Sequence, residues 1–286
     1  MFDYRYHAIS LAAVLLALAV GVLIGVAIGD SNLVSSAKSG VVRDLRAEVD
    51  GANHRAEELR GQIAASKAVQ EDLYPIAVHG LLRGRTVGLV FLGGASDPID
   101  GFAREAVTQA GGDLATVLAV REPLDTAGLA REASGTRYAA LGSEPGLMEK
   151  FGFRIAVELV NGGPFLGHVQ NRLFSAFDGQ LQRLDGVVLV RGEPSGWSSE
   201  AEHLAGEFEA GLLRGLNAKG VETVGAEVSS SEPSQVPWFK SHGLPSVDDL
   251  DAIAGRAALA FALTGARGAY GSKPTADALM PRVGAR

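Results

Sequence analysis

The most constraining feature of this sequence is the segment HAISLAAVLLALAVGVLIGVAIGD at residues 7–30, which has no charged residue between His7 and Asp30. Its central twenty residues, 9–28, contain one polar side chain, Ser10. A helix of twenty residues rises roughly 30 Å, which matches the thickness of the hydrocarbon core of a bilayer. The segment therefore predicts a transmembrane anchor, which we place at residues 1–30.

Two alternatives to a retained anchor stay open. A secretory signal peptide has an apolar region of about 7–15 residues followed by a small-x-small cleavage site. This run is longer, and the nearest such site, Ser35–Ala37, lies well beyond its end. A core helix of a soluble domain would carry a polar face, which this segment lacks. We expect a retained anchor in preference to a cleaved signal peptide or a buried core helix.

The charges beside the anchor indicate its orientation. The N-terminal flank carries the α-amino group and Arg5 against Asp3, whereas the other flank opens with Asp30 and has no basic residue before Lys38. Positive charge favours the cytoplasmic side of a membrane. We therefore expect a single-pass cell-membrane protein with a cytoplasmic N-terminus and an extracytoplasmic main domain.

Small residues recur every fourth position of the anchor and so share one helix face. Beginning at Ala13, the pattern continues through the candidate packing residues Ala17, Gly21, Gly25 and Gly29. Small residues at this spacing let two helices approach closely in lipid. Chance placement is the alternative, because glycine makes up 37 of the 286 residues.

A heptad pattern follows the anchor, in the predicted coiled-coil helix at residues 31–76. Its seven a and d positions are all apolar: Val42, Leu45, Val49, Ala52, Ala56, Leu59 and Ile63. Val and Ile at a with Leu at d favour a parallel dimer, so we expect a homodimer or a coiled-coil partner protein. A single amphipathic helix docked on the globular domain is the alternative. The helix should stop at Tyr74, since Pro75 disfavours the helical conformation in the residue before it.

Residues 81–271 alternate apolar strand patterns with helical ones. The strands are expected at 85–94, 113–120, 184–192 and 221–228, and helices at 100–112, 126–135, 146–163, 168–183, 198–220 and 246–265. Residues 136–142 fit either a strand or a turn. Strands that alternate with helices indicate a parallel sheet covered on both faces. The predicted fold class is therefore α/β, with a Rossmann-like extracytoplasmic domain after the two N-terminal helices, and the tail at 272–286 should be flexible.

Composition and motifs argue against several classes of function. The net charge is −7 without a basic stripe, so nucleic acid is not an expected partner, and the absence of cysteine excludes disulfides and thiolate sites. The Gly93-Gly94 turn lacks a phosphate-binding fingerprint. The acidic residues Asp97, Asp100, Asp248, Asp249 and Asp251 could meet near one sheet edge, but acids at helix starts are usually caps. We expect no catalytic residue, no resident cofactor and no enzymatic activity.

Ligands for a soft metal ion are also dispersed along the chain. None of the six histidines pairs with another at a spacing of three or four residues. They are His7, His54, His79, His168, His203 and His242. The methionines, Met1, Met148 and Met280, form no cluster. Because Cu(I) prefers thiolate and thioether ligands, we expect no tight copper site in these residues.

Three segments nevertheless resemble the bacterial MctB-type copper transport family: YHAISLAAVLLALAVGVLIG, EDLYP, and PSVDDLDAIAGRAALAFALTGARGAYGSK. The most specific parts are His7–Leu11 and Ser246–Asp251. The resemblance covers almost the whole chain and implies an envelope protein for copper efflux and resistance. Some members resemble coiled-coil partners in a membrane complex for cell separation. A scaffold that does not itself handle copper is therefore the alternative function.

Overall fold

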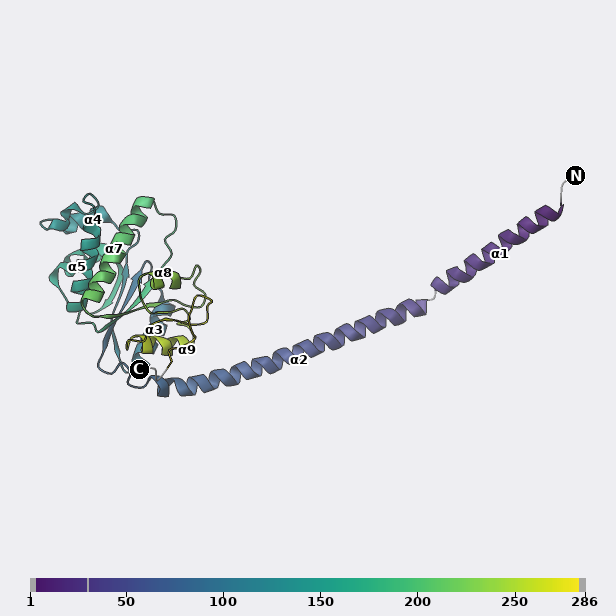
Figure 1. Ribbon diagram of the computed structural model, residues 1–286, viewed down its shortest axis with the longest axis horizontal. Coiled ribbons are helices and arrows are strands. Elements are labelled where there is room, and N and C mark those ends of the chain that lie inside the picture. Colours follow the sequence, from purple (N-terminus) through teal and green to yellow (C-terminus); the bar gives the residue numbers. More distant parts are fainter. Residues whose placement is uncertain (1–3, 30, 283–286) are drawn as a thin grey trace. The chain divides into compact units, whose positions relative to one another are not determined.

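The computed structural model describes residues 4–29 and 31–282. The chain separates into two compact units, residues 1–67 and 68–286. Helix α1 (Tyr4–Ile28) lies in the first unit, and α2 (Ser31–Val78) begins there and ends in the second (Figure 1). Residues 7–27 of α1 have a mean hydropathy of 2.8, so α1 is long and apolar enough to cross a membrane. The predicted N-terminal apolar helix is thus present.

Helix α2 continues beyond its predicted end. It includes Pro75 and runs to Val78, so the predicted stop at Tyr74 is wrong. Proline removes one backbone hydrogen bond and strains the preceding turn. That cost is offset here because Tyr74 and Val78, on one face of the last turns, are buried with Leu82 in the core of the second unit.

The second unit is built on a seven-stranded sheet with the strand order β3-β2-β1-β4-β5-β6-β7. The strands are β1 (Thr86–Leu92), β2 (Asp113–Val120), β3 (Phe174–Gly179), β4 (Gly186–Arg191), β5 (Glu222–Ala226), β6 (Ser246–Val247) and β7 (Ala269–Tyr270). All neighbouring strands are parallel except the antiparallel pair β2–β3. The mixed α/β class and the dominance of parallel pairing agree with the sequence analysis, whereas the finer Rossmann-like assignment stays a prediction.

Helices cover both faces of the sheet, which explains the continuous apolar runs of its central strands. They are α3 (Asp97–Gln109), α4 (Thr126–Glu132), the 3₁₀ helix η1 (Arg137–Ala140), α5 (Leu147–Asn161), α6 (Pro164–Leu173), α7 (Ser199–Ala218), α8 (Val236–Ser241) and α9 (Ile253–Ala262). One core joins the sheet to α4–α8, and the other joins it to α3, α9 and the end of α2 (Figure 1). Alternation along β1 shows the division, because Val90 and Leu92 belong to the first core and Leu89 and Phe91 to the second.

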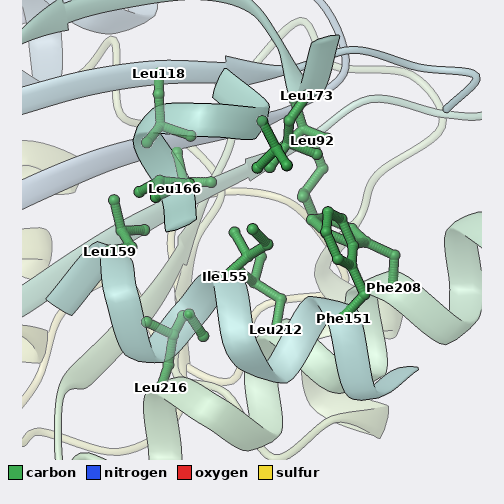
Figure 2. Packing of buried hydrophobic residues seen from close by; sticks show 14 of the residues in the cluster. Leu92, Leu118, Phe151, Ile155, Leu159, Leu166, Leu173, Phe208, Leu212 and Leu216 are labelled. Atoms are coloured by element: carbon green, nitrogen blue, oxygen red, sulfur yellow. The ribbon is translucent and has the colours of Figure 1, made fainter. Parts of the chain in front are cut away.

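The first core depends on a close approach between α5 and α7. Figure 2 shows Phe151, Ile155 and Leu159 of α5 in the same layer as Phe208 and Leu212 of α7. Glycines allow this approach, since a Cβ atom at Gly152 would overlap the carbonyl oxygen of Phe208. The helix pair therefore tolerates no added side-chain volume at its crossing.

Two local predictions differ from the structure, and one open alternative is decided by it. Residues 168–183 do not form one helix: α6 ends at Leu173, whose carbonyl accepts the N–H of Arg121, and β3 then pairs with β2 at the edge of the sheet. Of the two alternatives for residues 136–142, the turn agrees with the structure, in which residues 137–140 form the 3₁₀ helix η1. The last helix does not begin at Ser246, because this buried residue pairs in β6 and α9 starts at Ile253.

The C-terminal segment is also held more firmly than its sequence suggested. The backbone N–H groups of Ser272 and Lys273 donate to Oδ1 of the buried Asp248 at 2.9 and 3.3 Å. Nζ of Lys273 donates to Oε1 of the buried Glu227 at 2.7 Å. Buried carboxylates therefore hold the first two residues of the tail predicted at 272–286. Its flexibility stays a prediction, and residues 283–286 lie outside the described residues.

Candidate functional site

The small-residue face predicted in the anchor lies on α1 for most of its length. Ala17, Gly21 and Gly25 are within the helix, and Gly29 follows its end, where its N–H donates to the carbonyl of Gly25 at 2.8 Å. A Cβ atom added at Gly21 or Gly25 would meet no atom within 4 Å. The face is open to a second helix, and packing through it stays a prediction.

The predicted seam lies on α2, and its large side chains are exposed to solvent. Leu59 is 58% exposed and Ile63 is 67% exposed. Val42, Leu45, Val49 and Ala52 are likewise exposed, and Ala56 is half-buried. A continuous apolar stripe in water is costly and is typical of a surface that another helix covers. The structure contains one chain, so the coiled coil itself stays a prediction.

Sequence reasoning missed a second group of exposed apolar residues on α2, which follows this stripe. Val69, Leu73 and Ile76 are also exposed, with Ile76 at 73%. Their spacing of four and three residues places them on one face of α2, opposite the buried Tyr74 and Val78. The i, i+4, i+7 pattern was visible in the sequence, but the expected stop at Pro75 concealed it.

A polar cluster lies at the carboxyl edge of the sheet, where the strand order reverses. β2 and β4 flank β1 there, and doubly wound sheets bind their ligands at such a reversal. Gly93 follows the end of β1 and has a φ of 113°, which favours glycine. A Cβ atom at this position would lie 3.4 Å from Oε2 of Glu122, the carboxylate after β2.

Arg191, the last residue of β4, connects this edge to α7 and α8. Its Nε–H donates to Oε1 of Glu209 at 3.0 Å, and its Nη1–H donates to Oε1 of Gln235 at 2.6 Å. Gln235 in turn donates through Nε2 to Glu193 at 2.8 Å, and its backbone N–H donates to Glu227 at 2.6 Å. The loop after β4, the loop between β5 and α8, and helix α7 are thereby tied together by charge-assisted hydrogen bonds.

Two carboxyl groups in this cluster hold protons more tightly than usual. Burial and the charge of Glu209 raise the pKa of Glu122 to about 7, against the opposing effect of Arg191. Burial also raises the pKa of Glu209, although Arg191 and His242 act in the opposite direction. Carboxyls of raised pKa can donate or accept a proton near neutral pH. Sequence reasoning missed this cluster, because its members meet only after the sheet forms.

The five aspartates expected near one sheet edge form two separate groups. Asp97 and Asp100 follow β1 in the first turn of α3, where Asp100 pairs with Arg104 at 3.1 Å. The other three follow β6, three strand positions away from β1, which is roughly 14 Å. In that group Oδ2 of Asp251 accepts from the hydroxyl of Ser229 at 2.6 Å. Burial and the neighbouring charge of Asp248 raise the pKa of Asp249 to about 6.

Possible metal ligands do not converge in the described part of the chain. Residues 4–29 and 31–282 contain no group of three or more His, Asp or Glu side chains placed to hold a metal ion. Met148 is buried in the core between the sheet and α4–α8, and Met280 packs against the other core. His242 stacks on Trp238, and its Nδ1 lies 2.8 Å from the carbonyl oxygen of Trp238.

A hollow of about 560 Å³ opens at the amino end of β5, away from the polar cluster. Its lining includes Arg214, Arg267 and His242. Each arginine already has a carboxylate partner, since Arg214 pairs with Glu149 and Arg267 pairs with Glu222. The charges of the hollow are therefore largely balanced from within the chain.

The sequence of this chain matches a known protein family. Residues 1–144 and 167–281 match the family described as copper transport outer membrane protein, MctB. The chain belongs to the MctB family. Copper transporters MctB of Mycobacterium tuberculosis and Mycobacterium bovis are 32% identical to it over 122 residues. That alignment covers 43% of this chain and 38% of the length of those relatives.

The MctB match includes α1, α2, the whole sheet and the polar cluster, but it omits residues 145–166. Helix α5 lies within this unmatched stretch. Its closest packing is against α7, where Cβ atoms added at Gly211 or Gly215 would overlap the backbone of α5. This MctB-family chain therefore builds part of one core from a segment outside the family match.

Proposed function

We propose that this chain is a membrane-anchored envelope protein that contributes to copper homeostasis, and that it acts within a membrane assembly rather than as an enzyme. The observation that carries the copper role is the MctB match, which extends over residues 1–144 and 167–281. Its similarity to two proteins named copper transporter MctB supports the same role.

The proposed assembly is supported by the two N-terminal helices. Between His7 and Asp30 the chain has no ionisable residue that could mark an ion path through lipid. One such helix cannot line a channel alone, so transport would need several chains or another protein. The open small-residue face of α1 and the exposed seam of α2 are the surfaces through which assembly would occur.

The proposed topology places the N-terminus in the cytoplasm and residues 81–271 outside the membrane. Arg5 lies on the N-terminal side of the apolar helix, and Asp30 lies on the other side. Protease added to intact spheroplasts should then degrade the α/β unit. Protection of that unit would reverse the orientation, and a mature N-terminus after Ala37 would show that the anchor is cleaved.

The second candidate function is a scaffold for the cell envelope or for cell separation that does not bind copper. The dispersed histidines and the exposed seam favour it. Deletion of the gene, followed by growth in graded copper, tests the copper role: sensitivity restored by the full chain supports it. Normal copper tolerance together with a defect in cell separation would favour the scaffold.

A further inference from the structure

The charged residues of α2 are distributed unevenly around the predicted seam. Residues 42–67 contain five basic and five acidic side chains, so the segment has no net charge. In the heptad frame set by Val42 and Leu45, four of the five basic residues occupy the e and g positions beside the seam. They are Arg46, Arg55, Arg60 and Lys67. All four are exposed.

The acidic residues lie mainly on the opposite side of the helix. Four of the five occupy b and c positions: Asp44, Asp50, Glu57 and Glu58. Only Glu48 lies beside the seam, at a g position. His54 pairs with Glu58 at 3.5 Å along this outer face. The helix therefore presents an apolar seam with basic flanks and an acidic back.

A second copy of the chain does not complement these flanks. In a parallel pair, each g residue faces the e residue of the next heptad on the partner. The three pairs would be Glu48 with Asn53, Arg55 with Arg60, and Gln62 with Lys67. None joins opposite charges, and one sets arginine against arginine. In an antiparallel pair e faces e and g faces g. The e positions carry no acid, and the g positions offer a single acid, Glu48, so at most the Glu48–Arg55 contacts would join opposite charges while the basic e flanks face each other.

We propose that the α2 seam binds an amphipathic helix of a different protein, one whose apolar stripe is flanked by Asp and Glu residues. This inference rests on the proposed role of α2 in assembly and names the chemistry of its partner. Residues beside a coiled-coil seam set partner choice, both by attraction to the right helix and by repulsion of the wrong one. Ala52 and Ala56 leave room at the seam for larger apolar residues of the partner.

The test uses the full chain in detergent micelles and two synthetic helical peptides. Both peptides carry leucine and valine at a and d; the acidic probe has Glu at every e and g position, and the basic probe has Lys there. Fluorescence anisotropy measures binding, and light scattering gives the stoichiometry. We expect a 1:1 complex with the acidic probe, at least about tenfold tighter than with the basic probe, and a smaller difference in high salt because salt screens exposed charges.

Charge-reversal variants separate the proposal from a folding defect. Arg46→Glu/Arg55→Glu/Arg60→Glu should reverse the preference and bind the basic probe, which an unfolded helix could not do. The matched control, Asp50→Arg/Glu57→Arg/Glu58→Arg, changes the same number of charges on the back and should keep the preference for the acidic probe. Equal binding of the two probes by the wild-type chain would overturn the proposal.

A stable dimer of the chain would also overturn it, if Leu59→Asp abolished the dimer and the acidic probe could not displace it. The result of the peptide-binding experiment is independent of the proposed role in copper homeostasis. Copper sensitivity of a deletion strain would still support the proposed function if both probes bound equally, and acidic-probe binding would stand if copper tolerance were normal.

Discussion

The Nε–H of Arg191 donates to Oε1 of Glu209 at 3.0 Å, which joins the end of β4 to the middle of α7. Both side chains are largely buried, at 12% and 6% exposure. No sequence pattern around Arg191 or Glu209 indicates this ion pair, because the pair forms only when α7 packs on the sheet. Removing one member of such a buried pair strongly lowers the free energy of unfolding, because the other charge stays buried without a partner.

The first prediction is that Arg191→Met destabilises the α/β unit by about 3–5 kcal/mol, the usual cost of leaving a buried charge without its partner. Arg191→Met/Glu209→Met should recover much of this loss, because no unpaired charge remains. Urea unfolding followed by tryptophan fluorescence measures both, since Trp197 and Trp238 lie in this unit. An equally unstable double variant would contradict the explanation by charge.

The second prediction concerns Glu122, whose pKa in the folded chain is raised from 4.5 to about 7 by burial and by Glu209. Between these pH values the folded state keeps a proton that the unfolded chain loses, so stability should fall as pH rises through the window. At about 1.4 kcal/mol per pKa unit, the fall is at most roughly 3 kcal/mol. Glu122→Gln should remove most of this dependence of the free energy of unfolding on pH, whereas Glu144→Gln on the exposed surface should leave it unchanged. Urea unfolding at a series of pH values measures both.

The third prediction tests the close packing of α5 on α7. A Cβ atom at Gly211 would overlap the carbonyl oxygen of Glu149, so Gly211→Ala should cost about 1–3 kcal/mol or more through overpacking. Gly206 lies in the same helix with no atom within 4 Å of an added Cβ. Gly206→Ala should therefore stabilise the chain by about 0.5–1 kcal/mol. Stabilisation of the chain by both variants would show that helix propensity, not contact with α5, decides the result.

Segments buried on both faces were the most predictable from sequence. β1 and β4 follow continuous apolar runs bounded by glycine, and β2 and β5 follow shorter apolar patterns that begin after a glycine. The long periodic pattern of α7 predicted that helix to within a few residues. The edge strand β3 was missed because its exposed residues show neither a continuous apolar run nor a clear alternation. Its pairing with β2 is a tertiary effect, and it overrides a weak helical pattern.

The polar cluster could not be predicted, because it depends on strand order. Arg191, Glu209 and Gln235 are separated by 18 and 44 residues in the pairs that they form. Their elements follow one another in the chain but meet only when α7 packs on the sheet, and the reversal between β1 and β4 places Glu122, after β2, at the same edge. By contrast, the seam of α2 depends on local periodicity alone, which is why its apolar positions and its basic flanks are both visible in the sequence.

The fourth prediction is that the seam mediates association in the membrane. Leu59→Asp places a charge in the middle of the stripe, where burying it without a partner costs several kcal/mol. Crosslinked complexes recovered from intact membranes should disappear, while the tryptophan-detected unfolding of the α/β unit should not change. Ala47→Asp, at an outer f position of the same helix, is the control that should keep the complexes. Loss with both variants would point to a damaged helix instead of a damaged seam.

The fifth prediction is that the chain has no tight copper site of its own. Cu(I) should be kept reduced and titrated into the full chain against a competing chelator. Binding tighter than roughly micromolar, about −8 kcal/mol, is more than single dispersed side chains supply.

His242 is the residue that would decide an unexpected positive result. Its Nδ1 lies 2.8 Å from the carbonyl oxygen of Trp238, so a proton on Nδ1 would leave Nε2 as a lone-pair donor. Stoichiometric Cu(I) binding that vanished in His242→Ala, but not in the control His203→Ala, would show that His242 is a copper ligand and that other groups complete the site around it. If no binding were seen, any role of the chain in copper tolerance would act through the membrane assembly. A copper phenotype does not require that every chain of a complex binds the metal.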